Sequence, residues 1–260
     1  MALPVTSESR WFRRFHPRPD AEIALVCLPH AGGSASTYLS LARRLPETID
    51  VLAVQYPGRQ NRLHEPCLDT VQDLARGALD DLGPLAADRP VALFGHSMGA
   101  SVAFELARLL ERERSTVPLA LFVSGRRAPS LGTDRGVCLL DDDGIIAELH
   151  DLAGTDTRIL DEPDLLQLLL PSLRADYVAS ETYVAGPGAV TSCDVIALAG
   201  DRDPHVEVSE VADWRDHTTG TFELRVFPGA HFFINDHEPE IAAALADTLL
   251  AAAGPGPLIR

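Results

Sequence analysis

The sequence contains no lysine: all 22 of its basic residues are arginine, and 38 aspartates and glutamates outnumber them. The formal net charge of −16 argues against a nucleic-acid-binding protein, which would carry a basic face. No apolar run of about 18 residues occurs, so we expect no membrane-spanning helix. Neither G-x-G-x-x-G nor the P-loop pattern is present, so no nucleotide site is expected. These absences leave an acidic globular protein that binds neither nucleic acid nor membrane.

Cysteine is also scarce, and its four positions lie far apart in the chain: Cys27, Cys67, Cys138 and Cys193. There is no C-x-x-C pair, so we expect buried thiols and neither a metal site nor a disulfide. The first twenty residues carry arginine and polar side chains without an apolar core, unlike a signal peptide. We therefore expect a cytoplasmic protein.

What is present is an alternation of short apolar runs, which predict strands, with segments of helical spacing. With 46% hydrophobic residues, a chain of this length can bury roughly three quarters of its unfolded surface. Because the strands are apolar throughout, we expect an α/β protein with a mostly parallel sheet covered by helices on both faces. The expected strands are residues 11–15 at an edge, 23–28, 51–55, 91–94, 119–124, 194–199 and 222–227. The expected helices are residues 34–45, 71–85, 100–113, 209–217 and 239–252.

Residues 91–99 contain the pattern G-x-S-x-G, centred on Ser97. A predicted strand precedes the pattern and a predicted helix follows it, which is the context of a nucleophile elbow. We expect a strained backbone at Ser97 that points its hydroxyl out of the sheet, while Gly95 and Gly99 let strand and helix pass closely. The amide of Met98 then points to the place where negative charge would develop on a substrate oxygen.

The alternation is interrupted between residues 125 and 189, where no convincing strand occurs. Helices inserted between core strands are typical of a lid over a binding site. We therefore expect a core of residues 1–124 and 190–260 and a helical lid of residues 125–189, with an ordinary immobile subdomain as the alternative. The helical stretches are residues 145–152, 165–170 and, after Pro171, 172–183.

A serine nucleophile needs a base, and the base needs an acid that orients it. In hydrolase-type sheets the acid and then the histidine follow the serine in the chain. His231, after the strand at 222–227, is the candidate base. Asp201 and Asp203 both follow the strand at 194–199. Because they are two residues apart, strand alternation would place both on the same side, so either one could be the acid. The histidines expected to lie in solvent are His150, His205 and His217.

Acyl transfer also requires two preorganised N–H donors for the oxyanion. Met98 supplies one. We expect the second in the glycine-rich loop at residues 29–33, with the N–H of Ala31 as the donor. A generic strand-to-helix turn is the alternative for this loop. Chemistry of this kind needs no metal and no cofactor.

Taken together, these motifs resemble those of the type II, or editing, thioesterases of polyketide and nonribosomal peptide synthesis. The resemblance covers nearly the whole chain. It implies an α/β-hydrolase core with a helical lid, and hydrolysis of unwanted acyl groups from the phosphopantetheine arm of acyl or peptidyl carrier domains. It also implies that the acid is Asp203, the second aspartate of G-x-x-D. The segments that carry it are residues 28–34, 56–59, 95–99, 124–129, 173–177, 200–204 and 229–233.

Other functions would use the same residues. A carboxylesterase or a cyclising thioesterase would need the same serine, histidine and acid. A non-catalytic carrier-binding protein on this fold is an alternative of a different class, although the complete set of catalytic residues argues against it.

Two sets of residues are expected to bind the substrate. Several leucines of the predicted lid are too apolar for a fully solvated helix, so some should line an acyl channel, unless they only pack the lid on the core: Leu165, Leu166, Leu168, Leu169 and Leu170.

Carrier domains are generally acidic, as the resemblance implies, so this acidic chain needs a local basic patch to bind one. Arg126, Arg127 and Arg59 follow strands at the same sheet edge as Ser97 and would pair with the pantetheine phosphate or with carrier carboxylates. Ion pairs that tie the lid to the core are the alternative.

Overall fold

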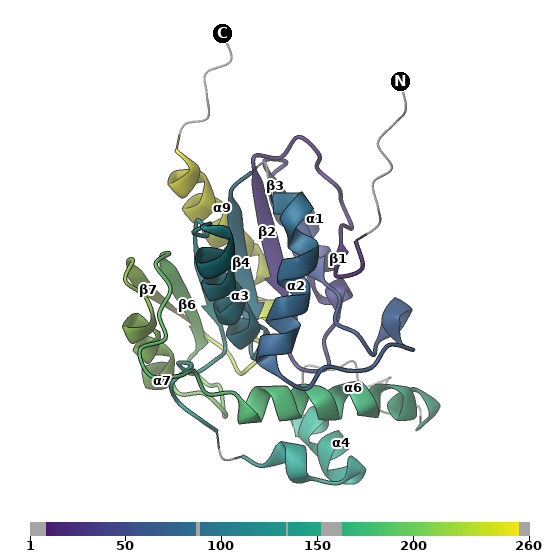
Figure 1. Ribbon diagram of the computed structural model, residues 1–260. Helices are drawn as coiled ribbons and strands as arrows, with labels where there is room; N and C mark the ends of the chain where they lie inside the picture. Colours follow the sequence, from purple (N-terminus) through teal and green to yellow (C-terminus); the bar gives the residue numbers. More distant parts are fainter. Residues whose placement is uncertain (1–8, 87–88, 134, 152–162, 255–260) are drawn as a thin grey trace, which may run out of the picture.

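A computed structural model describes residues 9–86, 89–133, 135–151 and 163–254. Its centre is a seven-stranded sheet in the order β1-β3-β2-β4-β5-β6-β7 (Figure 1). All neighbouring strands are parallel except β1, which pairs antiparallel with β3 at one edge. The predicted mostly parallel sheet and edge strand are therefore confirmed. The strands are β1 (Phe12–Arg13), β2 (Ile23–Leu28), β3 (Ile49–Val54), β4 (Val91–His96), β5 (Leu121–Ser124), β6 (Val195–Gly200) and β7 (Phe222–Phe227).

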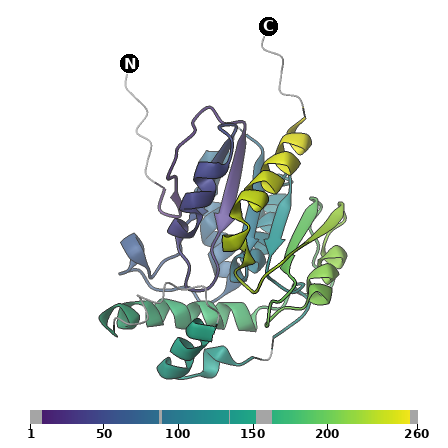
Figure 2. The same cartoon turned by 180° about the vertical axis from the view of Figure 1, so that it is seen from behind.

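Alternation along each strand divides the apolar side chains between two cores. In β2, Ile23 and every second residue after it pack into one core, while Ala24 and every second residue after it pack into the other. Helices α2 (Val71–Ala86) and α3 (Met98–Arg114) cover one face (Figure 1). Helices α1 (Leu39–Arg44) and α9 (Glu238–Ala253) cover the other (Figure 2). Because both faces of the sheet are covered, β2, β4, β5 and β6 are buried along their whole length, as the sequence indicated. The expectation of strands that are apolar throughout is wrong for β7, an edge strand with exposed Glu223 and half-buried Arg225.

The remaining short helices lie in the connections between the larger elements. The predicted helix at 34–45 is divided into a 3₁₀ turn, η1 (Ala35–Tyr38), and α1. The helix expected at 209–217 is likewise α7 (Val208–Ala212) followed by the 3₁₀ helix η4 (Asp213–His217). Two further elements are the 3₁₀ turn η2 (Gln60–Arg62) and α8 (Phe233–Asp236).

Between β5 and β6 the described residues form three helices, which we refer to as the inserted helices: η3 (Val137–Leu139), α4 (Asp142–Asp151) and α6 (Pro163–Thr182). They have an apolar cluster of their own, which includes Ile145 of α4 and Leu173 of α6. Figure 1 shows α6 and α4 lying together across one end of the sheet. The larger of the two, α6, contacts α3 and reaches the loop that follows β2.

The division of α6 at Pro171 is wrong, because the helix is continuous from Pro163 to Thr182. A proline inside a helix removes the N–H that would bind the carbonyl four residues earlier, here that of Gln167. Both Pro171 and Gln167 are exposed, so water can satisfy that carbonyl. The proline therefore lies on the face of the helix where its cost is lowest.

All four cysteines are free thiols; Cys27 and Cys193 are buried, as expected, whereas Cys67 and Cys138 are half-buried. Burial raises the pKa of Cys193 to about 11, so this thiol stays protonated at neutral pH. Among the described residues, no helix has the length and apolar character needed to cross a membrane.

Candidate active site

Loops from the carboxyl ends of four parallel strands converge on one cavity, which is where α/β sheets bind ligands. Ser97 follows β4, Gly125 follows β5, His231 follows β7 and Ala31 follows β2, and all four line the cavity. The opposite wall is formed by the inserted helix α6, through Tyr177, Ser180 and Glu181. The structure thus brings the predicted nucleophile, base and oxyanion loop to one place.

Ser97 has the strained backbone expected of a nucleophile elbow, with φ 54° and ψ −121° at the junction of β4 and α3. Its neighbours in the motif pack too closely for any side chain. A Cβ atom on Gly95 would collide with the carbonyl oxygen of Gly99, and one on Gly99 would collide with that of Leu28. The predicted close passage of strand and helix is confirmed.

His231 and Asp203 form a buried pair, with 2.7 Å between Nδ1 of the imidazole and Oδ2 of the carboxylate. The Asp203 side chain is only 1% exposed. Burial alone would raise the pKa of Asp203, but the hydrogen bond with His231 and its charge outweigh that cost and lower it. The second carboxylate oxygen accepts a hydrogen bond from the amide of His205 at 2.9 Å. Asp203 is therefore an ionised acceptor fixed on both sides.

Asp201, the other candidate acid, lies differently. Its side chain is 49% exposed, and its carboxylate accepts a hydrogen bond from the amide of Gly229 at 2.8 Å. Asp201 therefore closes the loop between β7 and His231, while Asp203 contacts the imidazole itself. The path of the loop thus distinguishes the two aspartates, which strand alternation could not do because they lie two residues apart.

Both predicted oxyanion donors lie near Ser97, and their role stays a prediction. Ala31 lines the cavity, and Met98 is the first residue of α3, next to Ser97. The amide of Gly32 donates to Asp176 and that of Gly33 donates to the carbonyl of His30. Among the hydrogen bonds within the described parts of the chain, none uses the N–H of Ala31 or of Met98. Within the described structure, both N–H groups are thus without an acceptor.

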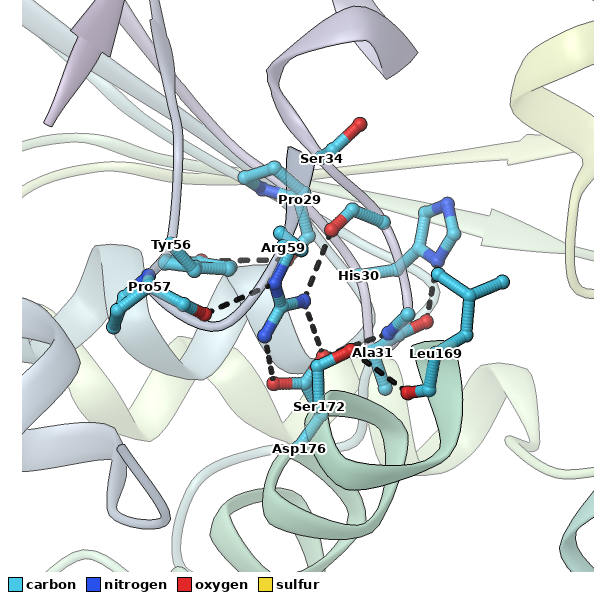
Figure 3. Close-up of polar contacts among 12 residues, drawn as sticks. Pro29, His30, Ala31, Ser34, Tyr56, Pro57, Arg59, Leu169, Ser172 and Asp176 are labelled. Carbon is cyan, nitrogen blue, oxygen red and sulfur yellow. Dashed lines mark hydrogen bonds and ion pairs between the residues drawn. The ribbon is translucent and has the colours of Figure 1, made fainter. Parts of the chain in front are cut away.

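An ion pair links the loop that follows β3 to α6, beside the glycine-rich loop at residues 29–33 that we call the oxyanion loop (Figure 3). Arg59 donates to both carboxylate oxygens of Asp176, at 2.6 and 2.8 Å. The side chains are 3% and 0% exposed, respectively. The expectation that Arg59 binds a carrier is therefore wrong, because a buried and fully paired guanidinium cannot reach a partner. Sequence reasoning assigned no role to Asp176, although it lies within the segment 173–177 that carries the resemblance.

Arg126 and Arg127 both line the cavity but differ in their contacts. Arg127 forms an ion pair with Glu210 at 3.2 Å. Arg126 donates to the hydroxyl and the carbonyl of Ser180 on α6, and no described carboxylate lies within ion-pair distance of it. Burial and the neighbouring Arg127 lower the pKa of Arg126 to about 10, so it remains charged at neutral pH. Arg126 is thus a cation without an acidic partner in the described structure.

Two of the histidine predictions are wrong. His205 lines the cavity, and its ring centroid lies 6.0 Å from that of His231. The backbone N–H of His205 donates a hydrogen bond to the Asp203 carboxylate, which folds the loop inwards. His217 is buried, and its ring nitrogens contact the carbonyl of Ala189 and the hydroxyl of Ser130. The side chain of His150 lies outside the described structure.

Two further histidines surround the site. His96, in the elbow, is fully buried, and burial and the charge of His231 hold its pKa well below the ordinary value. Burial likewise lowers the pKa of His30 to about 4. Both rings are neutral at pH 7, so they add no competing cation beside His231.

Three of the leucines predicted to line an acyl channel pack within the inserted helices. Leu166 belongs to the apolar cluster of those helices, and Leu169 and Leu170 pack against it. Leu168 is half exposed, and the side chain of Leu165 lies outside the described residues. The residues of α6 that line the cavity are instead Tyr177, Ser180 and Glu181. An acyl-binding role for these leucines stays a prediction.

Comparison with known proteins places the chain in a family. Residues 24–249 match the model of the thioesterase domain. The chain is 51% identical over 244 residues to thioesterase PikA5 of Streptomyces venezuelae, covering 94% of this chain and 87% of that protein. It is 44% identical over 250 residues to a probable cadicidin biosynthesis thioesterase of Streptomyces griseus, covering 95% and 69%.

Solved structures agree with these sequence relatives. The type II thioesterase BorB, from the borrelidin biosynthetic cluster, superposes with a TM-score of 0.85 at 43% identity, covering 92% of this chain and 98% of that one. YbtT, a type II thioesterase from the yersiniabactin pathway, gives a TM-score of 0.83 at 30% identity, covering 94% and 100%. The resemblance identified from the sequence motifs is confirmed. The chain therefore belongs to the thioesterase family, among the type II thioesterases of α/β-hydrolase fold.

Proposed function

We propose that this thioesterase hydrolyses acyl groups from the phosphopantetheine arm of acyl or peptidyl carrier domains, as an editing enzyme of polyketide or nonribosomal peptide synthesis. One observation carries the mechanism: Ser97 lies in a strained elbow in the same cavity as His231, whose imidazole is bound to Asp203. The identity of 51% to PikA5 and the likeness to BorB support the pathway context.

The first half of the reaction transfers the acyl group to the enzyme. His231 donates its Nδ1–H to Asp203, which leaves Nε2 unprotonated to take the proton of Ser97. The Ser97 oxygen attacks the thioester carbonyl, and the N–H groups of Ala31 and Met98 hold the oxyanion. The C–S bond then breaks, and His231 returns the proton to the sulfur. A thiol has a pKa of about 8.5, so it leaves far more readily than an amine.

The second half releases the acid. Water enters the cavity, gives a proton to Nε2 of His231 and attacks the carbonyl of the Ser97 ester. Collapse of the second tetrahedral intermediate breaks the ester bond, and the proton returns from His231 to Ser97. The chain's own residues supply the nucleophile, the base and the oxyanion donors.

The inserted helices are proposed to act as a lid over this chemistry. The proposed division is a core of residues 1–124 and 190–260 with a lid of residues 125–189. The lining of the cavity supports this role, because Tyr177, Ser180 and Glu181 of α6 line the same cavity as Ser97. A lid in this place would exclude bulk water until the acyl group is bound.

A mass-spectrometric assay tests the proposal. Carrier domains loaded with different acyl groups are incubated with the protein, and loss of the acyl mass from the intact arm is followed over time. We expect free arm and free acid to accumulate, with Ser97→Ala as the inactive control. Cleavage of oxyesters but not of carrier-bound thioesters would indicate a carboxylesterase, and a cyclic product would indicate a cyclising enzyme. Failure of Ser97 to react with a fluorophosphonate probe would indicate a non-catalytic binding protein.

Arg126 is expected to bind the phosphopantetheine arm or its carrier. Because its guanidinium has no described acidic partner, Arg126→Gln should raise KM for a carrier-bound thioester by about tenfold, the loss of one charge-assisted contact. Turnover of a small uncharged thioester should remain almost unchanged. Arg127→Gln is the comparison, because its pair with Glu210 gives it a role in holding the site together. Equal losses on both substrates for Arg126→Gln would contradict a docking role.

A further inference from the structure

A carboxylate of the inserted helix α6 binds the backbone of the oxyanion loop. Oδ2 of Asp176 accepts a hydrogen bond from the amide of Gly32 at 2.7 Å. Arg59, from the loop after β3, binds the same carboxylate and also donates to the carbonyl of Gly33 at 3.0 Å (Figure 3). Three segments far apart in the sequence thus meet directly beside Ala31.

The ion pair of Arg59 with Asp176 is not explained on physical grounds by the stability of the fold alone. Asp176 is fully buried and Arg59 nearly so, and removing two charges from water costs several kcal/mol for each ion, which their attraction repays only in part. An apolar pair of similar volume would often stabilise the fold as well or better. What an apolar pair could not supply is an acceptor for the Gly32 amide and a donor for the Gly33 carbonyl.

The backbone of the loop depends on these contacts. Gly32 has φ +74°, in the left-handed region. Its amide donates to Asp176, while the preceding N–H, that of Ala31 beside the cavity, has no acceptor among the residues that the structure describes. Leu173, three residues before Asp176 and thus on the same face of α6, packs on Gly32 so closely that a Cβ there would lie 2.6 Å from its Cδ2. Two side chains of α6 therefore fix one residue of the oxyanion loop.

We propose that Asp176, held by Arg59, is a positioning residue that orients the oxyanion loop, so that the Ala31 N–H forms the oxyanion hole only while α6 is docked. This inference rests on the proposed acyl-enzyme mechanism. It makes α6 a fixed part of the active site: helix and oxyanion hole form together and are lost together. Substrate must then enter past other parts of the lid.

Kinetics of Asp176 variants test this coupling. Asp176→Asn keeps an oxygen for the Gly32 amide but sets an NH₂ group against Arg59, and Asp176→Ala removes both contacts. We expect kcat for a small thioester to fall about tenfold for the first and about 100-fold for the second, with KM changed less than twofold, since loss of one oxyanion donor costs about 10²- to 10³-fold. Asp142→Asn is the matched control, because its pair with Arg174 joins α6 to α4 at the surface.

A second variant separates positioning from stability. The apolar double substitution Arg59→Met with Asp176→Leu removes both charges and should recover the Tm that Asp176→Ala loses. It restores no acceptor for Gly32, so kcat should stay about 100-fold low. An alkylboronic acid, whose adduct with Ser97 places an anionic oxygen in the oxyanion hole, should bind these variants more weakly by a similar factor. A thioether substrate analogue, which develops no such charge, should bind them normally.

The outcomes distinguish this inference from the proposed function. If wild-type protein neither turns over thioesters nor reacts at Ser97, the proposed function fails. If wild-type protein is active and the apolar double variant regains both Tm and kcat, Asp176 is only structural and the inference is overturned. Equal weakening of the boronic acid and of the thioether would also overturn it, because it would indicate general damage to the cavity.

Discussion

Replacing Asp203 by Asn is expected to lower kcat for thioester hydrolysis by about 10⁴-fold, the loss seen when the acid of a serine protease triad is changed in this way. Nδ1 of His231 lies 2.7 Å from the Asp203 carboxylate, so an amide NH₂ there would favour the tautomer in which Nδ1 accepts. The imidazole proton would then sit on Nε2, and His231 could not take the proton of Ser97. Steady-state kinetics on a small acyl thioester, with circular dichroism to confirm folding, measure the effect.

Asp201→Asn is the matched control, because it makes the same chemical change two residues away. The exposed Asp201 accepts a hydrogen bond from the amide of Gly229, and the oxygen of an Asn side chain can still do so. We expect its kcat to remain within about threefold of wild type, as for other surface substitutions. A crippled Asp201→Asn beside a nearly normal Asp203→Asn would reverse the assignment of the acid.

Much of the core could be predicted from the sequence, because its structure is dictated locally. The bounds of β2 and β7 agree with the prediction to the residue, and a proline directly follows each of them, Pro29 after β2 and Pro228 after β7. The elbow could be predicted as well, because only glycines tolerate the contacts at positions 95 and 99. Prediction from local sequence was least accurate in the inserted helices. Pro171 predicted a helix break, but α6 continues through it because the proline lies on the exposed face of the helix.

The contacts that complete the site could not be predicted, because they join residues distant in the sequence. Arg59 and Asp176 are 117 positions apart, and no property of either residue names the other. Asp201 and Asp203 share a parity, so only the path of the loop decides which one meets His231. His205 likewise faces the cavity through one backbone hydrogen bond that no pattern encodes. The sequence was enough to propose a role for several residues, but the structure was needed to find which residues they contact.

Gly99→Ala is expected to damage the enzyme severely, although alanine is favoured over glycine inside a helix by about 1 kcal/mol. Gly99 is the second residue of α3, and a Cβ there would collide with the carbonyl oxygen of Leu28 at the end of β2. Backbone cannot move aside as a flexible side chain would, so the start of α3 must shift, and with it Ser97 and the Met98 amide. A displacement of about 1 Å at reacting groups can cost 10²-fold in rate, so we expect kcat to fall at least 100-fold.

A glycine elsewhere in the chain provides the control for that substitution. Apart from residue 186 itself and its two chain neighbours, no described heavy atom would lie within 4 Å of a Cβ on Gly186, so Gly186→Ala should leave kcat unchanged and the free energy of unfolding within about 0.5 kcal/mol of wild type. Urea unfolding and thioester kinetics on both variants give the comparison. Because the collision at Gly99 involves two backbone segments of the core, its variant should also lose about 1–3 kcal/mol of stability, as overpacked cores do. Near-normal turnover by Gly99→Ala would mean that α3 can move away from β2 without displacing Ser97, and that the close packing of the elbow does not position the nucleophile.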